Sequence, residues 1–339
     1  TGIYYDATEP SDLENLLNGS GGDLEGQLQS AQHAIEAIKR HDLSKYNHAP
    51  RAAERLLGDA SCPRVLILDQ TRGATSVTLG RADAESFTAM LDDAQMRFPT
   101  ARLFVKTHPD VLAGKKQGYL TEAAKRRGIA IIAQDVSPLS LLAQADVVYT
   151  VTSQMGFEAL LLGKEVHCFG MPFYAGWGAT HDRLTCPRRA KRRTAEEIFA
   201  AAYMLYARYV NPVAAKRCDI HEAIRILAAQ RFQQMLIGKF RHVLRGVVDP
   251  GGQVGSQRLQ SGLDARNAPC QRAVQSGLCQ RCPLPPFGGD DLHHGFGLGQ
   301  AHAAVFQCAA GKLAGAGGRS TGQVQRFQQA LGHGVAAVD

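Results

Sequence analysis

Between residues 61 and 235, short apolar runs alternate with stretches whose apolar residues recur at helical spacing. The continuous apolar runs have the length of buried parallel strands and lie at 65–68, 103–105, 129–132, 147–149 and 166–169. The helical stretches between them lie at 83–97, 120–127, 138–143 and 157–162. This alternation predicts the α/β class, with a Rossmann-like parallel sheet and flanking helices.

A parallel sheet of this kind places its ligands at the carboxyl ends of its strands. The loops that follow four of the predicted strands span 69–76, 106–110, 150–156 and 170–178. We therefore expect these four loops to share one rim of the sheet and to carry the chemistry of the protein.

The segments on either side of the predicted sheet have a different pattern. Residues 1–60 predict an interdomain, helical lead-in segment, in which Ser11 and Glu14 have the spacing of a capping box. Helices over 196–208 and 219–229 close the predicted domain, which extends over 61–235.

The last region, 236–339, contains no Glu, holds 19 of the 35 glycines and shows no lasting periodicity. Two interpretations stay open: an irregular, disordered tail, or translation in a shifted reading frame that begins between 232 and 245. Cys270, Cys279 and Cys282 in this tail have a spacing that superficially suggests zinc. One CxxC pair without a second is a weak signal for a metal site.

Composition narrows the class of partner. The 339 residues carry a formal net charge of +7, which favours an anionic partner, and no nucleic-acid-binding module is visible. No apolar run reaches the roughly 18 residues that suggest a membrane span. Eight scattered cysteines do not form the framework of a secreted protein, so a cytoplasmic location is expected. The chain begins without Met or a signal peptide, and we expect it to be part of a longer gene.

Thr152, Ser153 and Gly156 lie where a predicted strand ends and a helix begins. Backbone N–H groups and the helix dipole at such a point suit a phosphate, and the two hydroxyls can add donors. Glu158 lies in the first turns of the helix, where its carboxylate can accept ribose hydroxyls. The alternative is that Ser153 only caps the helix and Glu158 is a solvated helix residue.

Two other loops offer groups for acid–base chemistry. His108 follows a strand, and Pro109 fixes the turn so that the imidazole can donate to a phosphate. Asp69 also follows a strand and can act as an acid, base or nucleophile, while Arg72 beside it is a candidate for donor binding. The alternatives are an ordinary loop histidine and an aspartate that caps its own loop.

The fourth loop supplies aromatic rings and leads into a basic run. Tyr174 and Trp177 can stack on a sugar or base, unless the loop is simply packed. Arg183 is a candidate for the sugar or acceptor side. The basic run over 188–193 is typical of a solvated face, with contact to lipid phosphate at the inner membrane as the alternative.

Seven segments occur in an order that resembles one known family. They read GIYYDATEPSDLE (2–14), SKYN (44–47), VLILDQTRGATSV (65–77), VKTHPD (105–110), TSQMGFEALLLGKEV (152–166), FGMPFYAGWGATHDR (169–183) and PRRAKRR (187–193). They resemble the KpsC-type capsule polysaccharide proteins, which are bacterial β-Kdo glycosyltransferases. The similarity covers residues 2–231.

The resemblance implies a GT-B-like architecture of which this chain holds the donor-binding lobe, with the acceptor lobe largely missing. It implies retaining transfer of Kdo from CMP-Kdo to a lyso-phosphatidylglycerol-linked Kdo acceptor, without a cofactor or bound metal. Capsule assembly and export proteins are the implied partners. By position, His108 and Pro109 match the donor-binding motif, and Ser153 and Glu158 match the nucleotide-contacting turn and helix.

One residue departs from the family pattern. The position after Gly73 is Asp in the family and Ala74 here. If that Asp is the catalytic carboxylate, a methyl group cannot replace it, and Asp69 should not be assumed to do so. The sequence thus keeps two hypotheses: a Kdo transferase, active or inactive, and a non-catalytic nucleotide-binding or scaffold component of capsule assembly. A sugar-nucleotide epimerase is disfavoured by the aromatic block.

Overall fold

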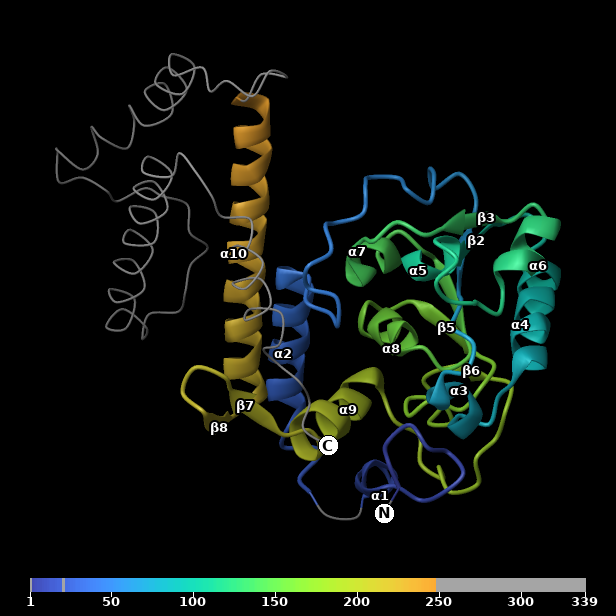
Figure 1. Ribbon diagram of the computed structural model, residues 1–339. Coiled ribbons are helices and arrows are strands. Elements are labelled where there is room, and N and C mark those ends of the chain that lie inside the picture. Colours follow the sequence, from blue (N-terminus) through green and yellow to red (C-terminus); the bar gives the residue numbers. More distant parts are fainter. Residues whose placement is uncertain (1, 20–21, 248–339) are drawn as a thin grey trace. The chain divides into compact units, whose positions relative to one another are not determined.

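The computed structural model describes residues 2–19 and 22–247 (Figure 1). The chain divides into two compact units, Thr1–Ile237 and Gly238–Asp339, and the sheet lies in the first. The predicted cysteine cluster at 270–282 and most of the predicted tail lie outside the described residues.

A six-stranded parallel sheet forms the centre of the first unit. Its strands are β1 (Arg64–Leu68), β2 (Arg102–Lys106), β3 (Ala130–Ile132), β4 (Val147–Thr150), β5 (Glu165–Cys168) and β6 (His181–Asp182). Their order is β3-β2-β1-β4-β5-β6, the order of the Rossmann fold, in which the winding reverses between β1 and β4. All five predicted strands are confirmed, and only the two-residue edge strand β6 escaped the sequence pattern.

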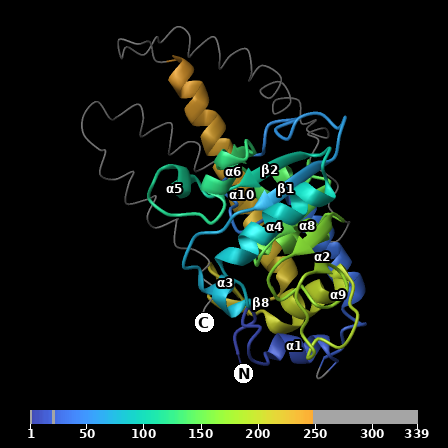
Figure 2. The same cartoon turned by 90° about the vertical axis from the view of Figure 1, so that its right-hand side faces the viewer.

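Helices cover both faces of this sheet. The α-helices up to residue 199 are α1 (Asp12–Leu17), α2 (Leu28–His41), α3 (Thr75–Leu79), α4 (Ala84–Arg97), α5 (Pro109–Leu112), α6 (Thr121–Arg126), α7 (Pro138–Leu142), α8 (Gln154–Leu161) and α9 (Ala195–Phe199). Figure 1 shows α4 and α6 on one face and α7 and α8 on the other, and Figure 2 looks onto the face that α4 and α6 cover.

The sequence of β1 shows why its apolar run is continuous. Val65 and Ile67 belong to the hydrophobic cluster that contains Phe87 and Leu91 of α4. Leu66 and Leu68 belong to the opposite cluster, with residues of α7 and α8. Alternate side chains point to opposite faces, so a strand buried on both faces must be apolar at every position.

The C-terminal part of the first unit departs from the prediction in two ways. The predicted helix 196–208 is α9 followed by a π-helix, η1 (Ala200–Tyr206), and a hairpin of β7 (Tyr209–Asn211) and β8 (Lys216–Cys218) comes next. The next helix, α10 (Ile220–Val247), continues past residue 236, where an irregular tail was predicted. Residues 236–247 contain no proline and are mostly helix-compatible, so the change in composition does not end the helix. Within the described part of the chain, no helix is long and apolar enough to cross a membrane.

The basic run 188–193 attaches the N-terminal segment to the sheet domain. Glu14 of α1 is buried and accepts from Nε of Arg188 and of Arg189, both at 3.0 Å. Arg189 also donates to the carbonyl oxygens of Pro172 and Ala175, at 2.6 Å each.

Arg193 completes this attachment, since its Nε donates to the carbonyl of Leu17 at 2.8 Å. The prediction of a solvated face is therefore wrong for Arg189. Its side chain is only 1% exposed, because Glu14 neutralises its charge inside the protein. Lys191 and Arg192 are the exposed members of the run.

We expect Arg189→Met to lower the free energy of unfolding by about 3–5 kcal/mol, because it leaves the buried Glu14 carboxylate with one partner fewer. The midpoint of urea unfolding measures this. Arg192→Met is the matched control, since Arg192 is exposed, and it should change the free energy by no more than about 0.5 kcal/mol. Equal effects of the two substitutions would contradict the role of Arg189 in attaching the N-terminal segment.

Candidate functional site

A cavity of about 770 Å³ lies at the carboxyl ends of the strands, where the winding of the sheet reverses. All four predicted loops contribute to its wall. The wall includes Asp69, Gln70, Thr71, Ala74, Lys106, Thr107, His108, Asp110, Thr152, Ser153, Gln154, Glu158, Pro172, Phe173 and Tyr174. The expectation that these loops share one rim is confirmed.

The N-terminal segment forms part of the same cavity, which the sequence did not predict. Tyr4, Tyr5, Lys45, Tyr46 and His48 all line it. The only sequence signal for the first four was their presence in two of the family-like segments, which His48 directly follows. Neither periodicity nor spacing connects residues 4–48 with a sheet that begins at residue 64. The lead-in segment therefore belongs to the site.

Gln70 joins the two strands between which the winding reverses. Its Oε1 accepts from the backbone N–H of Thr152 at 2.9 Å, and its Nε2 donates to the Thr152 hydroxyl at 3.0 Å. Gln70 follows β1 and Thr152 follows β4, so this pair fixes the distance between the loops on either side of the cavity. Gln70 was not among the residues chosen from the sequence.

The carboxylate of Asp69 is held by five hydrogen-bond donors. The backbone N–H groups of Gln70, Tyr119 and Leu120 donate to its Oδ1, at 2.9, 2.9 and 3.0 Å. The hydroxyls of Thr107 and Thr121 donate to its Oδ2, at 3.1 and 3.3 Å.

Burial nevertheless raises the pKa of Asp69, because desolvation opposes its charged form more strongly than these donors favour it. The donors tie the loops after β1 and β2 to the start of α6. A carboxylate with every donor already in place is suited to positioning these loops, while a catalytic role for Asp69 stays a prediction.

Ser153 begins α8, and its hydroxyl accepts from the N–H of Met155 at 3.3 Å. The Tyr174 hydroxyl donates to the carbonyl of Ser153 and lies directly over Gly156. A methyl group at position 156 would clash with Tyr174 Oη and approach Thr150 Cγ2 at 2.8 Å. Glycine is thus needed here so that the start of α8 can pack against the fourth loop.

Glu158 is the most unusual acidic group of the cavity. The residue is 8% exposed, lines the cavity, and its Oε2 is buried without a hydrogen-bond partner. The pKa of its carboxyl is raised to about 8, mainly because burial disfavours the charged form. A buried unpartnered carboxylate oxygen costs free energy unless a ligand supplies the missing donor, so Glu158 indicates a ligand with hydroxyl or N–H groups.

His108 lines the same cavity from the loop after β2. Its Nδ1 accepts from the backbone N–H of Asp110 at 3.1 Å, so the neutral imidazole carries its proton on Nε2. The Nδ1 also lies 3.6 Å from the Asp110 carboxylate, which Lys116 Nζ approaches at 3.6 Å from another side. The arrangement orients the ring and leaves an Nε2–H donor.

Lys106, at the end of β2, supplies a cation that the sequence analysis did not single out. Its Nζ donates to the carbonyl oxygens of Thr107 and Gln134, at 2.9 and 3.3 Å. Burial lowers its pKa, because no carboxylate in direct contact offsets the desolvation. An anionic group of a ligand would restore the stability of its charged form.

Four of the described residues chosen from the sequence are not among those that line the cavity, namely Gly156, which lies beneath Tyr174, and Trp177, Arg72 and Arg183. Trp177 is fully buried, and its Nε1 donates to the carbonyl of Phe173 at 2.9 Å, so stacking on a sugar is wrong for this ring and packing explains it. Arg72 lies over the Tyr119 ring at 5.0 Å and donates to Gly118. Arg183 is exposed and lies over the ring of Phe169 at 5.6 Å.

Ala74, the departure from the family pattern, is the N-cap of α3 and lines the cavity. Its φ and ψ of −65° and 120° are those of an N-cap, but no side chain caps the helix. An aspartate at this position could accept from the first N–H groups of α3 and face the cavity at the same time.

The fold and the cavity define an α/β protein with a cavity at the reversal of a Rossmann-like sheet. A family profile described as capsule polysaccharide biosynthesis protein matches residues 1–214, and the chain belongs to this family. The resemblance to KpsC-type proteins is thereby confirmed.

Relatives and solved structures agree with this assignment. The capsule polysaccharide modification protein LipA of Neisseria meningitidis serogroup B is 44% identical over 273 residues, which cover 76% of this chain and 39% of LipA. The lipopolysaccharide-processing protein LpsZ of Rhizobium meliloti is 36% identical over 232 residues, which cover 68% of this chain and 53% of LpsZ. The chain therefore spans about two fifths to half of the length of these relatives.

Two solved structures of KpsC from Thermosulfurimonas dismutans share the fold. Its β Kdo 2,4 transferase is 48% identical, with a TM-score of 0.64, and the match covers 67% of this chain and 70% of that one. Its β Kdo 2,7 transferase is 31% identical, with a TM-score of 0.53, and the match covers 68% of this chain and 70% of that one.

We expect Ala74→Asp to raise the free energy of unfolding by about 1 kcal/mol, because the new carboxylate caps α3. Ala74→Asn is the control that caps the helix without a charge, and urea unfolding of both variants measures the effect. A destabilised Ala74→Asp beside a stabilised Ala74→Asn would show that the cavity rejects a charge at this position.

Proposed function

We propose that this chain carries the donor-binding part of a Kdo transferase of capsule polysaccharide biosynthesis, which acts in the cytoplasm on a lipid-linked acceptor at the inner membrane. The donor is CMP-Kdo, and the acceptor is a lyso-phosphatidylglycerol-linked Kdo. The observation that carries this proposal is Glu158, a buried carboxylate with an unpartnered oxygen, on the helix after the strand at which the sheet reverses. The similarity to Kdo transferases supports the identity of the sugar.

In the proposed complex, the Glu158 carboxylate accepts hydroxyl groups of the CMP ribose. The phosphate lies at the N-terminus of α8, where the backbone N–H groups and the helix dipole favour an anion. His108 donates from Nε2 to a phosphate oxygen, and Lys106 adds a positive charge on the same side. The GT-B architecture stays part of this proposal.

Transfer breaks the bond between the anomeric carbon of Kdo and the phosphate oxygen, so CMP leaves with the electron pair. The donors around the phosphate stabilise the charge that develops on this leaving group. The acceptor hydroxyl then forms the new bond and loses its proton to a base. Retention by two inversions at the anomeric carbon uses a nucleophile that first displaces the phosphate, after which the acceptor oxygen displaces the nucleophile.

The candidate position for this nucleophile is residue 74, and Ala74 cannot supply it. The five donors that hold the Asp69 carboxylate favour a positioning role for it over that of the nucleophile. This observation favours a second candidate function: a nucleotide-binding or scaffold component of capsule assembly and export that does not turn over.

The first test uses the pH dependence of CMP binding. The ionised Glu158 carboxylate accepts two hydroxyls, so binding below pH 8 requires the loss of a proton. We expect CMP affinity to rise by up to about tenfold per pH unit as pH increases toward 8, and to level off above it. Calorimetry across this range measures the affinity and the proton release.

The phosphate of CMP also titrates, so matched variants are needed to separate its contribution to the pH dependence from that of Glu158. Glu158→Gln binds the same phosphate, so its profile should lose the rise that ends near pH 8. Glu54→Gln removes an exposed carboxylate away from the cavity and should bind as the unaltered chain does. Identical profiles for Glu158→Gln and the unaltered chain would exclude Glu158 from donor binding.

The second test asks whether residue 74 limits transfer. We expect Ala74→Asp to gain release of CMP from CMP-Kdo in the presence of a Kdo-primed lipid acceptor, because the carboxylate supplies the missing nucleophile or base. Mass spectrometry of the acceptor measures the added Kdo, and Ala74→Asn is the uncharged control. Intact CMP binding without any Kdo transfer in Ala74→Asp would refute this role and favour the non-catalytic function.

A further inference from the structure

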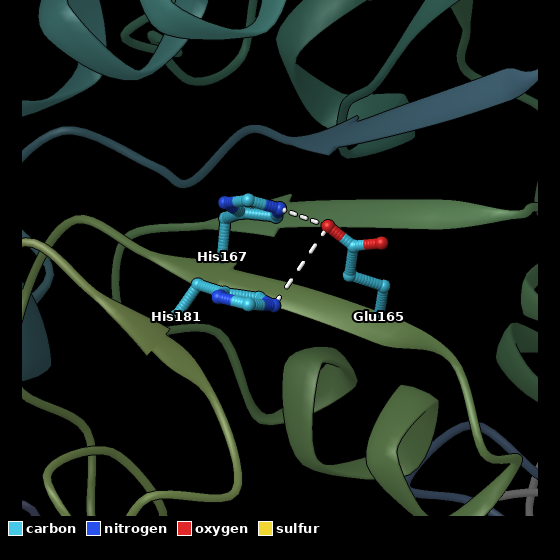
Figure 3. Close-up of side chains that lie close together, drawn as sticks. All are labelled: Glu165, His167 and His181. Atoms are coloured by element: carbon cyan, nitrogen blue, oxygen red, sulfur yellow. Dashed lines mark hydrogen bonds and ion pairs between the residues drawn. The ribbon is translucent and has the colours of Figure 1, made fainter. Parts of the chain in front are cut away.

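A second cluster of polar side chains lies at the edge of the sheet, apart from the cavity. Glu165 and His167 are two residues apart on β5, so they point to the same face. His181 of β6 is the register partner of His167. Figure 3 shows both rings beside the Glu165 carboxylate, and one ligand atom of each residue lies within 4.8 Å of the other two.

The distances are close to those of a metal site. Glu165 Oε1 lies 2.7 Å from His167 Nε2 and 3.8 Å from His181 Nε2. Ligands at about 2.0–2.1 Å around a tetrahedral zinc are about 3.3 Å apart, a value between these two distances. Rotation of the exposed Glu165 and His181 side chains would bring the three atoms around one ion.

Packing holds the His167 ring in place between Tyr149 and His181. The Tyr149, His167 and His181 rings form a row across β4, β5 and β6, with centroid distances of 4.4 and 4.7 Å. The Tyr149 hydroxyl donates to Asp93 of α4 at 2.9 Å, which anchors one end of the row.

The exposure of the cluster suits a site that an ion can enter. The His167 side chain is 5% exposed, whereas Glu165 is 44% and His181 is 65% exposed. We propose that Glu165, His167 and His181 bind a Zn²⁺ ion, with water in the fourth position. Two imidazoles and one carboxylate favour zinc over magnesium or calcium, which prefer oxygen ligands.

A zinc ion here would stabilise the edge of the sheet. β6 has only two residues, His181 and Asp182, and a bond from both histidines to one ion would hold β6 against β5. The segment between these strands includes Phe173 and Tyr174 of the cavity wall. The proposed ion is thus a structural one, whose binding is linked to the stability of this segment.

The experiment titrates Zn²⁺ into the full chain in which Cys270, Cys279 and Cys282 are replaced by Ser, because these thiols are a competing set of zinc ligands. We expect one equivalent to bind and the melting temperature to rise with the zinc concentration, an increase that a chelator reverses. The d–d absorption of Co²⁺ in place of Zn²⁺ should show nitrogen and oxygen ligands.

Single substitutions assign this binding to the cluster. His181→Ala and Glu165→Gln should each weaken it by about tenfold or more, and circular dichroism should show both variants folded, since both side chains are partly or largely exposed. His33→Ala, at an exposed position on α2, is the matched control and should bind as the parent does. Unchanged affinity in His181→Ala, or zinc binding only while the three cysteines are present, would overturn the proposal.

Discussion

The buried guanidinium of Arg189 is the interaction on which one whole wall of the cavity depends. It neutralises Glu14 of the N-terminal segment and donates to the carbonyl oxygens of Pro172 and Ala175 in the fourth loop. Tyr4 and Tyr5 precede the first contact, and Phe173 and Tyr174 lie within the second, so a single charge connects both sources of aromatic rings. A buried guanidinium needs all these acceptors, and their positions are therefore fixed together.

The opposite wall depends on hydrogen bonds at the ends of β1 and β4. The Asp69 carboxylate accepts hydrogen bonds from Thr107 in the loop after β2 and from Tyr119 before α6. Gln70 connects the loop after β1 to the loop after β4. Parallel strands leave unpaired polar groups at their carboxyl ends, and these two side chains pair them. Of the acidic groups along the rim described above, Glu158 keeps a buried oxygen without a partner.

The sequence predicted the sheet well because burial on both faces leaves a continuous apolar run, as in Val65 to Leu68. The shared position of the loops after the strands could be predicted because parallel strands all end at the same edge of the sheet. The placement of His108, Ser153 and Glu158 at this edge followed from it. Partners distant in sequence could not be predicted in this way. Nothing local distinguishes an arginine that pairs with Glu14, 175 residues away, from one that faces solvent, so Arg189 resembled Arg192.

Trp177 shows the same limit in apolar form. An aromatic ring in a glycine-rich loop has the same sequence pattern whether it packs inward or stacks on a sugar. Only the tertiary contacts of the ring show which of the two roles it has. Ala74 is a different case from Trp177. At position 74 the carboxylate of the family pattern is absent, whereas Trp177 is present but buried. The cavity presents a buried carboxylate and N–H donors, yet its N-cap position on α3 carries a methyl group. Binding and turnover place separate demands on the proposed site, and the carboxylate missing at position 74 concerns turnover rather than binding.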